Sequence, residues 1–161
     1  KRSCPPVSSG RAGGRKMIFW DSSAIIPLCI DEPHSKTVKN AAKRDSVMAV
    51  WWGSIVECQS AFARLRRDSF LSITEEDQVR NLLTILTEAW TEIEPSEDIR
   101  DIAARLLLLH PLRAADSLQL AAALVWAGKT PKGHHFACLD RRLREAARKE
   151  GFVLLPAELP E

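Results

Sequence analysis

The sequence has no hydrophobic run long enough to cross a membrane. A spanning helix needs roughly 20 apolar residues, and the longest candidate, Leu106 to Leu109, is part of an amphipathic pattern. Residues 1–16 also lack the apolar middle of a secretory signal peptide. Of the 161 residues, 45% are hydrophobic and 27% charged, which is typical of one globular domain. We therefore expect a cytoplasmic protein that has no membrane partner.

Cysteine is scarce and lacks the spacing of a zinc site. No two of Cys4, Cys29, Cys58 and Cys138 form a Cys-x-x-Cys pair, so the sequence does not indicate zinc binding. Three of the four lie inside apolar segments. We interpret these three as buried thiols of a protein that works in a reducing compartment.

Strong positive charge is also missing once the N-terminus is set aside. Residues 1–16 contain five of the 23 Lys and Arg residues and none of the 21 Asp and Glu residues, so the formal charge of +2 becomes about −3 for the remainder. The first 16 residues are rich in Gly, Ser and Pro, which indicates a flexible basic tail. We expect the folded domain at residues 17–161, without a strongly basic surface for nucleic acid.

The sequence lacks the loops that bind phosphate in nucleotide-binding proteins. Neither Gly-x-Gly-x-x-Gly nor Gly-x-x-x-x-Gly-Lys-Ser/Thr occurs. Asp21-Ser22-Ser23 lacks the second acid of an Asp-x-Asp-x-Thr phosphatase. A phosphotransfer or nucleotide-binding protein is therefore the least favoured class.

Short apolar runs alternate with helical periodicity from Met17 onward. This alternation predicts parallel strand pairing, because parallel crossovers need helices. The expected fold is a three-layer α/β/α sandwich with a mostly parallel five-stranded sheet, whose ligands bind beyond the carboxyl ends of the strands. Strands are expected at residues 17–20, 46–50, 91–94, 135–139 and 152–155. Helices are expected at residues 22–30, 34–44, 53–69, 112–127 and 140–150, with two more beginning after caps at Thr74 and Ser96.

Four acids interrupt this pattern where apolar or small neighbours predominate: Asp21, Glu57, Asp116 and Asp140. Asp21 and Asp140 directly follow predicted strands, and all four can converge on one cleft. Converging carboxylates resist joint ionisation, and a divalent cation removes that cost. Oxygen ligands suit Mg²⁺, and also Mn²⁺, and such an ion can activate water against a phosphodiester.

Each acid also has an ordinary structural explanation. Asp21 and Asp140 could be helix N-caps, and Asp116 could be a first-turn acid favoured by the helix dipole. Glu57 could be a solvent-facing helix residue. These alternatives stay open from the residues alone.

Four segments together resemble the motifs of a known family. FWDSSAII, SIVECQSAFARL, AADSLQLAAAL and ACLDRRLREAARKEGF resemble, in order, the acidic motifs of PIN-domain proteins, and most closely those of VapC-type toxins of toxin–antitoxin systems. The resemblance covers residues 17–156. It implies a Mg²⁺-dependent endoribonuclease whose metal-bound water cleaves RNA, leaving 5′-phosphate and 3′-hydroxyl ends.

The same resemblance implies the roles of particular residues and partners. Asp21, Glu57, Asp116 and Asp140 would be the catalytic, metal-binding residues, with Ser22 in support. The protein would form a homodimer and be silenced by a cognate antitoxin.

Arg64 and Arg141 could hold RNA phosphates, or they could belong to solvated helix faces. The alternative function is a non-catalytic PIN-like module that binds RNA or protein without tight metal chemistry.

Overall fold

The computed structural model describes residues 17–43 and 47–159. The tail predicted at residues 1–16 lies outside the described residues. Among the described residues, no helix is both long enough and apolar enough to cross a membrane.

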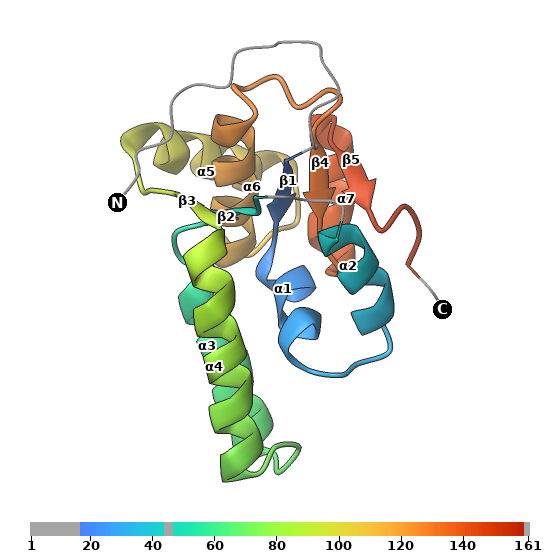
Figure 1. Ribbon diagram of the computed structural model, residues 1–161. Helices are drawn as coiled ribbons and strands as arrows, with labels where there is room; N and C mark the ends of the chain where they lie inside the picture. The colour runs from blue at the N-terminus through green and yellow to red at the C-terminus, as the bar shows by residue number, and fades with distance from the viewer. Residues whose placement is uncertain (1–16, 44–46, 160–161) are drawn as a thin grey trace.

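The described residues form a five-stranded sheet in which every neighbouring pair of strands is parallel, in the order β3-β2-β1-β4-β5 (Figure 1). β1 lies at the centre, where Phe19 is in register with Ala49 of β2 and Phe136 of β4. The predicted parallel sheet is therefore confirmed. The strands are β1 Ile18–Trp20, β2 Ala49–Trp51, β3 Thr91–Ile93, β4 His135–Ala137 and β5 Val153–Leu155.

Helices cover both faces of the sheet. Alternate side chains of a strand point to opposite faces, so Ile18 and Trp20 pack into one core and Phe19 into the other. The core around Trp20 is closed by α1 Ser22–Cys29, α2 Ser35–Ala42, α3 Ser54–Arg67 and α4 Ile73–Ala89. The core around Phe19 is closed by α5 Glu97–Leu109, α6 Ala114–Trp126 and α7 Arg141–Glu150. The predicted three-layer α/β/α sandwich is confirmed.

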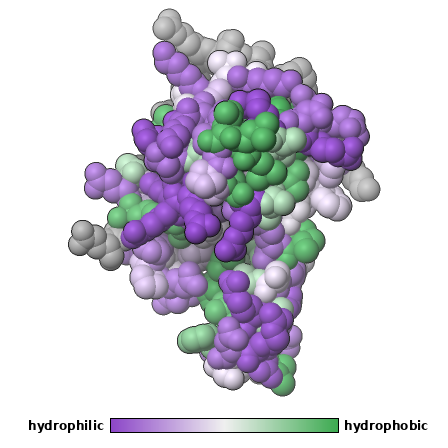
Figure 2. All heavy atoms as spheres, turned by 180° about the vertical axis from the view of Figure 1, so that it is seen from behind, coloured by the Kyte–Doolittle hydropathy of each residue, from purple (hydrophilic) through white to green (hydrophobic). Residues whose placement is uncertain are grey.

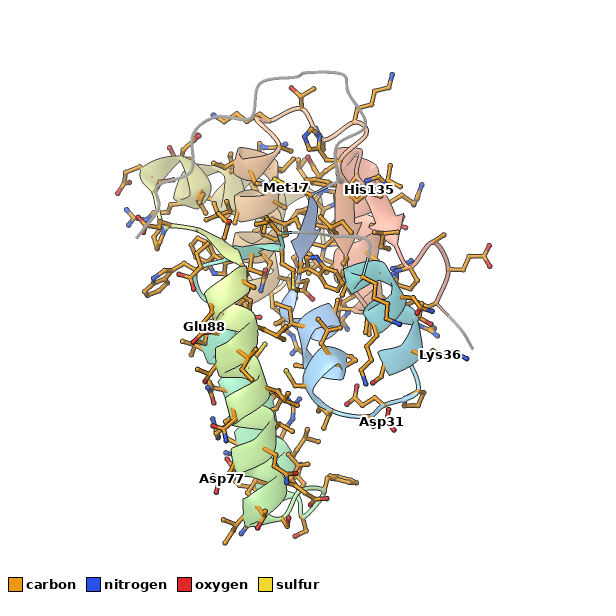
Figure 3. All side chains as sticks on the ribbon, in the orientation of Figure 1. Met17, Asp31, Lys36, Asp77, Glu88 and His135 are labelled. Carbon is orange, nitrogen blue, oxygen red and sulfur yellow. The ribbon has the colours of Figure 1, made fainter. Side chains whose placement is uncertain are left out.

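All five strands run in the same direction, so their carboxyl ends share one edge of the sheet. Met17 and His135 lie together at the opposite edge, where β1 and β4 begin (Figure 3). At the carboxyl edge, Asp21 connects β1 to α1 and residues 138–140 connect β4 to α7. This edge is where a ligand site is expected in a parallel sheet.

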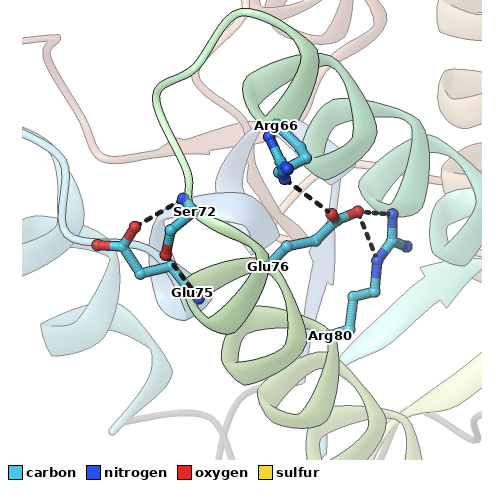
Figure 4. A network of polar contacts seen from close by, with 5 residues as sticks. All are labelled: Arg66, Ser72, Glu75, Glu76 and Arg80. Carbon is cyan, nitrogen blue, oxygen red and sulfur yellow. Dashed lines mark hydrogen bonds and ion pairs between the residues drawn. The ribbon is translucent and has the colours of Figure 1, made fainter.

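α3 and α4 form a long antiparallel pair that projects away from the sheet (Figure 1). Asp77 lies near the far end of the pair and Glu88 nearer the sheet (Figure 3). The predicted cap at Thr74 is wrong. Ser72 is the N-cap: its hydroxyl accepts from Glu75 N at 3.2 Å, and Ser72 N donates to Glu75 Oε2 at 2.8 Å (Figure 4). This reciprocal capping box fixes the start of α4 at Ile73.

The C-terminal segment is tied to the sheet by a buried arginine on α7. Arg144 is only 7% exposed and has no carboxylate partner among the described residues. Its guanidinium donates to four backbone carbonyls: Cys138 at 2.8 Å, Leu155 at 3.4 Å, Pro156 at 2.8 Å and Ala157 at 3.2 Å. These bonds join the end of β4 to the chain that follows β5.

On the face seen in Figure 2 the surface is mostly hydrophilic, with a broad apolar area in its upper part and smaller apolar areas elsewhere. Three exposed leucines lie together at the end of α5, where Leu108 is 88% exposed and Leu107 and Leu109 flank it.

Candidate active site

Asp21 is a buried carboxylate that caps a helix. It follows β1 directly and is 3% exposed. Its Oδ2 accepts from Ser23 N at 3.0 Å and from the Ser23 hydroxyl, and the Cys138 thiol donates to the same oxygen at 3.5 Å. Burial and, to a smaller extent, the charge of Glu57 raise the pKa of Asp21 to about 6. Asp21 is therefore the N-cap of α1. A capping side chain can remain exposed, so the capping role does not explain why this carboxylate is buried at a cost in free energy.

Glu57 lies in the first turn of α3, and each of its carboxylate oxygens accepts one side-chain hydrogen bond. The Ser22 hydroxyl donates to Oε2 at 2.7 Å, and Gln119 Nε2 donates to Oε1 at 3.2 Å. Partial burial, together with the charge of Asp116, raises the pKa of Glu57. Glu57 is therefore not a free solvent-facing residue: it joins α1, α3 and α6.

Asp116 lies in the first turn of α6, where its Oδ2 accepts from Arg113 N at 3.3 Å. Partial burial raises its pKa, and the charge of Asp140 adds to the rise. The charges of Arg113 and Arg142 act in the opposite direction. Asp116 thus has a carboxylate neighbour and two cationic neighbours.

Asp140 is exposed and caps α7, where its Oδ1 accepts from Leu143 N at 2.8 Å. The turn that carries it is bonded to the first acid through Ser23. The Ser23 hydroxyl oxygen accepts from Leu139 N at 2.8 Å and from Asp140 N at 3.3 Å, while the hydroxyl also contacts Asp21. Ser23 therefore joins the ends of β1 and β4.

The four acids form a series of electrostatic neighbours at the carboxyl edge. Burial is the main cause of the raised pKa values of Asp21, Glu57 and Asp116. The charge of Glu57 adds to the rise at Asp21, that of Asp116 to the rise at Glu57, and that of Asp140 to the rise at Asp116. Within the described residues, however, no three His, Cys, Asp or Glu side chains lie close enough to hold one metal ion. The convergence on one region follows from the structure, and metal binding by these acids stays a prediction.

The two arginines that were predicted to bind phosphate are less closely connected with the acids than Arg113 and Arg142 are. Arg64 and Arg141 are exposed, and neither has an ion-pair partner in the described part of the chain. Arg113 and Arg142 act on Asp116 instead. RNA binding by Arg64 and Arg141 remains a prediction.

Sequence reasoning did not single out Ser23, Gln119 or Cys138, although each contacts an acid of the site. Ser23 and Cys138 contact Asp21, and Gln119 contacts Glu57. One signal was present for Gln119, because it is a polar residue inside the Ala- and Leu-rich segment AADSLQLAAAL. A hydroxyl beside an N-cap and a cysteine in an apolar run are too common to be informative.

The parallel β3-β2-β1-β4-β5 sheet, covered by helices on both faces, has the VapC-like PIN-domain fold. No protein-family model matches the sequence, and no curated protein is significantly similar to it. The evidence for the fold therefore comes from solved structures.

Three of these structures illustrate the similarity. FitAcB from Neisseria gonorrhoeae is 15% identical, with a TM-score of 0.60 over 88% of this chain and 98% of that chain. VapBC2 from Rickettsia felis, bound to a DNA fragment from its promoter, is 12% identical, with a TM-score of 0.60 over 86% and 96%. Mycobacterium tuberculosis VapC20, described as a sarcin–ricin loop cleaving toxin, is 17% identical, with a TM-score of 0.58 over 80% and 94%. The resemblance predicted from the motifs is confirmed for the fold.

Proposed function

We propose that this protein is a Mg²⁺-dependent endoribonuclease and the toxin of a type II toxin–antitoxin pair. The observation that carries the proposal is the gathering of four acids at the edge of the sheet where ligands bind, with Ser22 joining α1 to Glu57 and Ser23 joining Asp21 to the turn of Asp140. The raised pKa values of Asp21, Glu57 and Asp116, caused mainly by burial, agree with it. The description of VapC20 as a sarcin–ricin loop cleaving toxin supports the choice of a nucleic-acid substrate.

The donor set suits a hard divalent cation. Asp21, Glu57, Asp116 and Asp140 offer only oxygen, which Mg²⁺ and Mn²⁺ prefer. Burial and mutual repulsion raise the pKa of the first three, and a bound cation would offset both costs. Within the described residues no three of these side chains lie close enough to share one ion, so binding would require them to draw together around it. When bound, the ion would supply an activated water and neutralise charge developing on the phosphodiester.

The protein's own contribution is to hold the carboxylates in place and to attract the substrate. Ser22 restrains Glu57, Ser23 restrains Asp21, and Leu143 N restrains Asp140. Arg113 and Arg142, whose charges reach Asp116, are the cations best placed to hold RNA phosphates beside the acids. Arg64 and Arg141 would extend this contact along the RNA.

The proposal also includes partners. A cognate antitoxin would silence the protein in the cytoplasm, and the protein would act as a homodimer. The similar structures include a toxin–antitoxin complex from Klebsiella pneumoniae and the DNA-bound VapBC2 complex, which supports an antitoxin partner.

The decisive test is cleavage of RNA by the purified protein with Mg²⁺. We expect Asp21→Asn and Asp116→Asn to lower the rate by at least about 100-fold, because each removes a charge that would hold the ion. Asp101→Asn, at an exposed acid on α5, is the matched control and should leave the rate unchanged.

The products and the metal provide independent checks. Sequencing the RNA ends should show 5′-phosphate and 3′-hydroxyl groups, and a chelator should stop the reaction. Cleavage by the two variants at the parental rate would show that these acids are not the active site. RNA binding without any cleavage would favour the non-catalytic module.

A further inference from the structure

Gln119 is a fully buried polar residue on an otherwise apolar helix. It is 0% exposed, and the next residues of α6, from Leu120 to Ala123, are equally buried. Burying an amide costs free energy unless hydrogen bonds compensate. A polar residue that breaks the local pattern in this way often marks a functional site.

The amide of Gln119 is only partly compensated. Nε2 donates to Ser54 Oγ at 3.0 Å and to Glu57 Oε1 at 3.2 Å. Oε1 is buried and has no hydrogen-bond partner among the described residues. Rotating the amide would pair Oε1 with the Glu57 carboxylate, placing two acceptors together, so the orientation with Nε2 toward Glu57 is favoured. In this orientation Oε1 of Gln119 is left without a hydrogen bond, while Nε2 donates one to Glu57.

Both oxygens of the Glu57 carboxylate accept a hydrogen bond, each from a different helix. Ser22, on α1, fixes Oε2, and Gln119, on α6, fixes Oε1. Without these bonds the long side chain could adopt other rotamers, because the N-terminal part of α3 is not fully buried. Partners that orient a ligand in this way are important for metal affinity.

We propose that Gln119 is a positioning residue that holds Glu57 ready for a divalent cation and so sets the affinity of the site. This inference rests on the proposed metal-dependent function. Gln119 is too deeply buried to touch RNA, so it acts through Glu57 alone.

The test is calorimetric titration of the full-length, metal-free protein with Mn²⁺. Gln119→Met keeps a similar volume and removes the donor, and we expect it to weaken Mn²⁺ binding by about 10- to 100-fold. Gln119→Leu makes the same test with a residue already common in α6, in case the Met variant does not fold. Thermal unfolding establishes that each titrated variant is folded.

Ser54→Ala is the matched control. It removes the other hydrogen-bond partner of the same amide, and its side chain is equally buried, but it leaves the bond from Gln119 to Glu57 in place. A purely structural role for Gln119 would make the Ser54 and Gln119 variants alike. We expect parental Mn²⁺ affinity in Ser54→Ala and weakened affinity in the Gln119 variants only.

The outcomes separate this inference from the proposed function. Parental Mn²⁺ affinity in folded Gln119→Met or Gln119→Leu would overturn the role of Gln119 while leaving the nuclease proposal intact. Equal weakening in Ser54→Ala would also overturn it, because burial rather than the bond to Glu57 would be responsible. A parent protein that neither binds Mn²⁺ nor cleaves RNA would overturn both.

Discussion

Asp21 shows how one carboxylate can cap a helix and remain available for chemistry. Its Oδ2 is occupied by Ser23 N, the Ser23 hydroxyl and the Cys138 thiol, whereas no hydrogen bond to Oδ1 is recorded in the described part of the chain. Capping therefore explains the position of Asp21 but not its burial. The raised pKa is the energetic consequence of that burial.

Replacing Asp21 should stabilise the metal-free protein at high pH. Folding raises the pKa of Asp21 from 3.8 to about 6, so its contribution to stability is greatest below pH 3.8 and is lost as the pH rises through about 6. Asp21→Asn keeps the cap and removes the charge. We expect the variant to gain about 1–3 kcal/mol relative to the parent at pH 8 and little at pH 4.

Urea unfolding in the presence of a chelator measures this difference at the two pH values. Asp101→Asn, at an exposed position, should show no comparable gain. An equal effect of Asp21→Asn at pH 4 and pH 8 would contradict the role of the buried charge.

The acids of the site could be chosen from the sequence because a carboxylate stands out where apolar neighbours predominate. Their supporting residues could not. Ser23 bonds to residues more than 100 positions away, and Gln119 bonds to α3. Such contacts depend on how distant elements meet in space, which periodicity does not encode.

At the scale of the element, α4 provides a direct test of capping. The segment Ser72-Ile73-Thr74 offers two hydroxyl residues, each followed three positions later by an acid. The sequence analysis predicted the cap at Thr74, whereas the structure places the capping box at Ser72 (Figure 4). Beside it, Glu76 pairs with Arg80 within the helix at 2.5 Å.

Ser72→Ala should lower the free energy of unfolding by about 1 kcal/mol, because it leaves Glu75 N without its acceptor. Thr74→Ala is the matched control, since Thr74 lies inside the helix and is exposed. Chemical denaturation of both variants measures the difference. A greater loss from Thr74→Ala would place the functional cap at Thr74.

The predicted strands and helices were all found, with small differences at their ends. Residues 44 and 46, where one predicted helix ends and one predicted strand begins, lie outside the described residues. β2 extends to Trp51, one residue beyond the prediction, and β4 ends at Ala137, two residues before it. Apolar runs reveal that a strand exists, but its ends are decided by hydrogen bonds to neighbouring strands. The layer order followed from parallel pairing, whereas the strand order β3-β2-β1-β4-β5 did not follow from the sequence.

Across the whole molecule, Arg144 on α7 joins the end of β4 to the chain that follows β5. Arg144→Met should lower the free energy of unfolding by about 2–4 kcal/mol, because several buried carbonyls lose a charged donor. It should also expose residues 156–159 to proteases. Arg148→Ala, which removes an exposed ion pair on the same helix, should change stability by less than about 1 kcal/mol.

Thermal unfolding and limited proteolysis of the two variants test this role. Equal stability in the two variants would mean that Arg144 is not what secures the C-terminal segment.

The central position of β1 has a consequence for protein synthesis. β1 leaves the ribosome before the other strands of this sheet, and it needs β4, made more than 100 residues later, to complete its pairing. The acids are equally dispersed, from Asp21 to Asp140, so the cluster assembles only after the segment that carries Asp140 has been released. If this protein cuts RNA, the growing chain stays harmless to the message and the ribosome that are producing it.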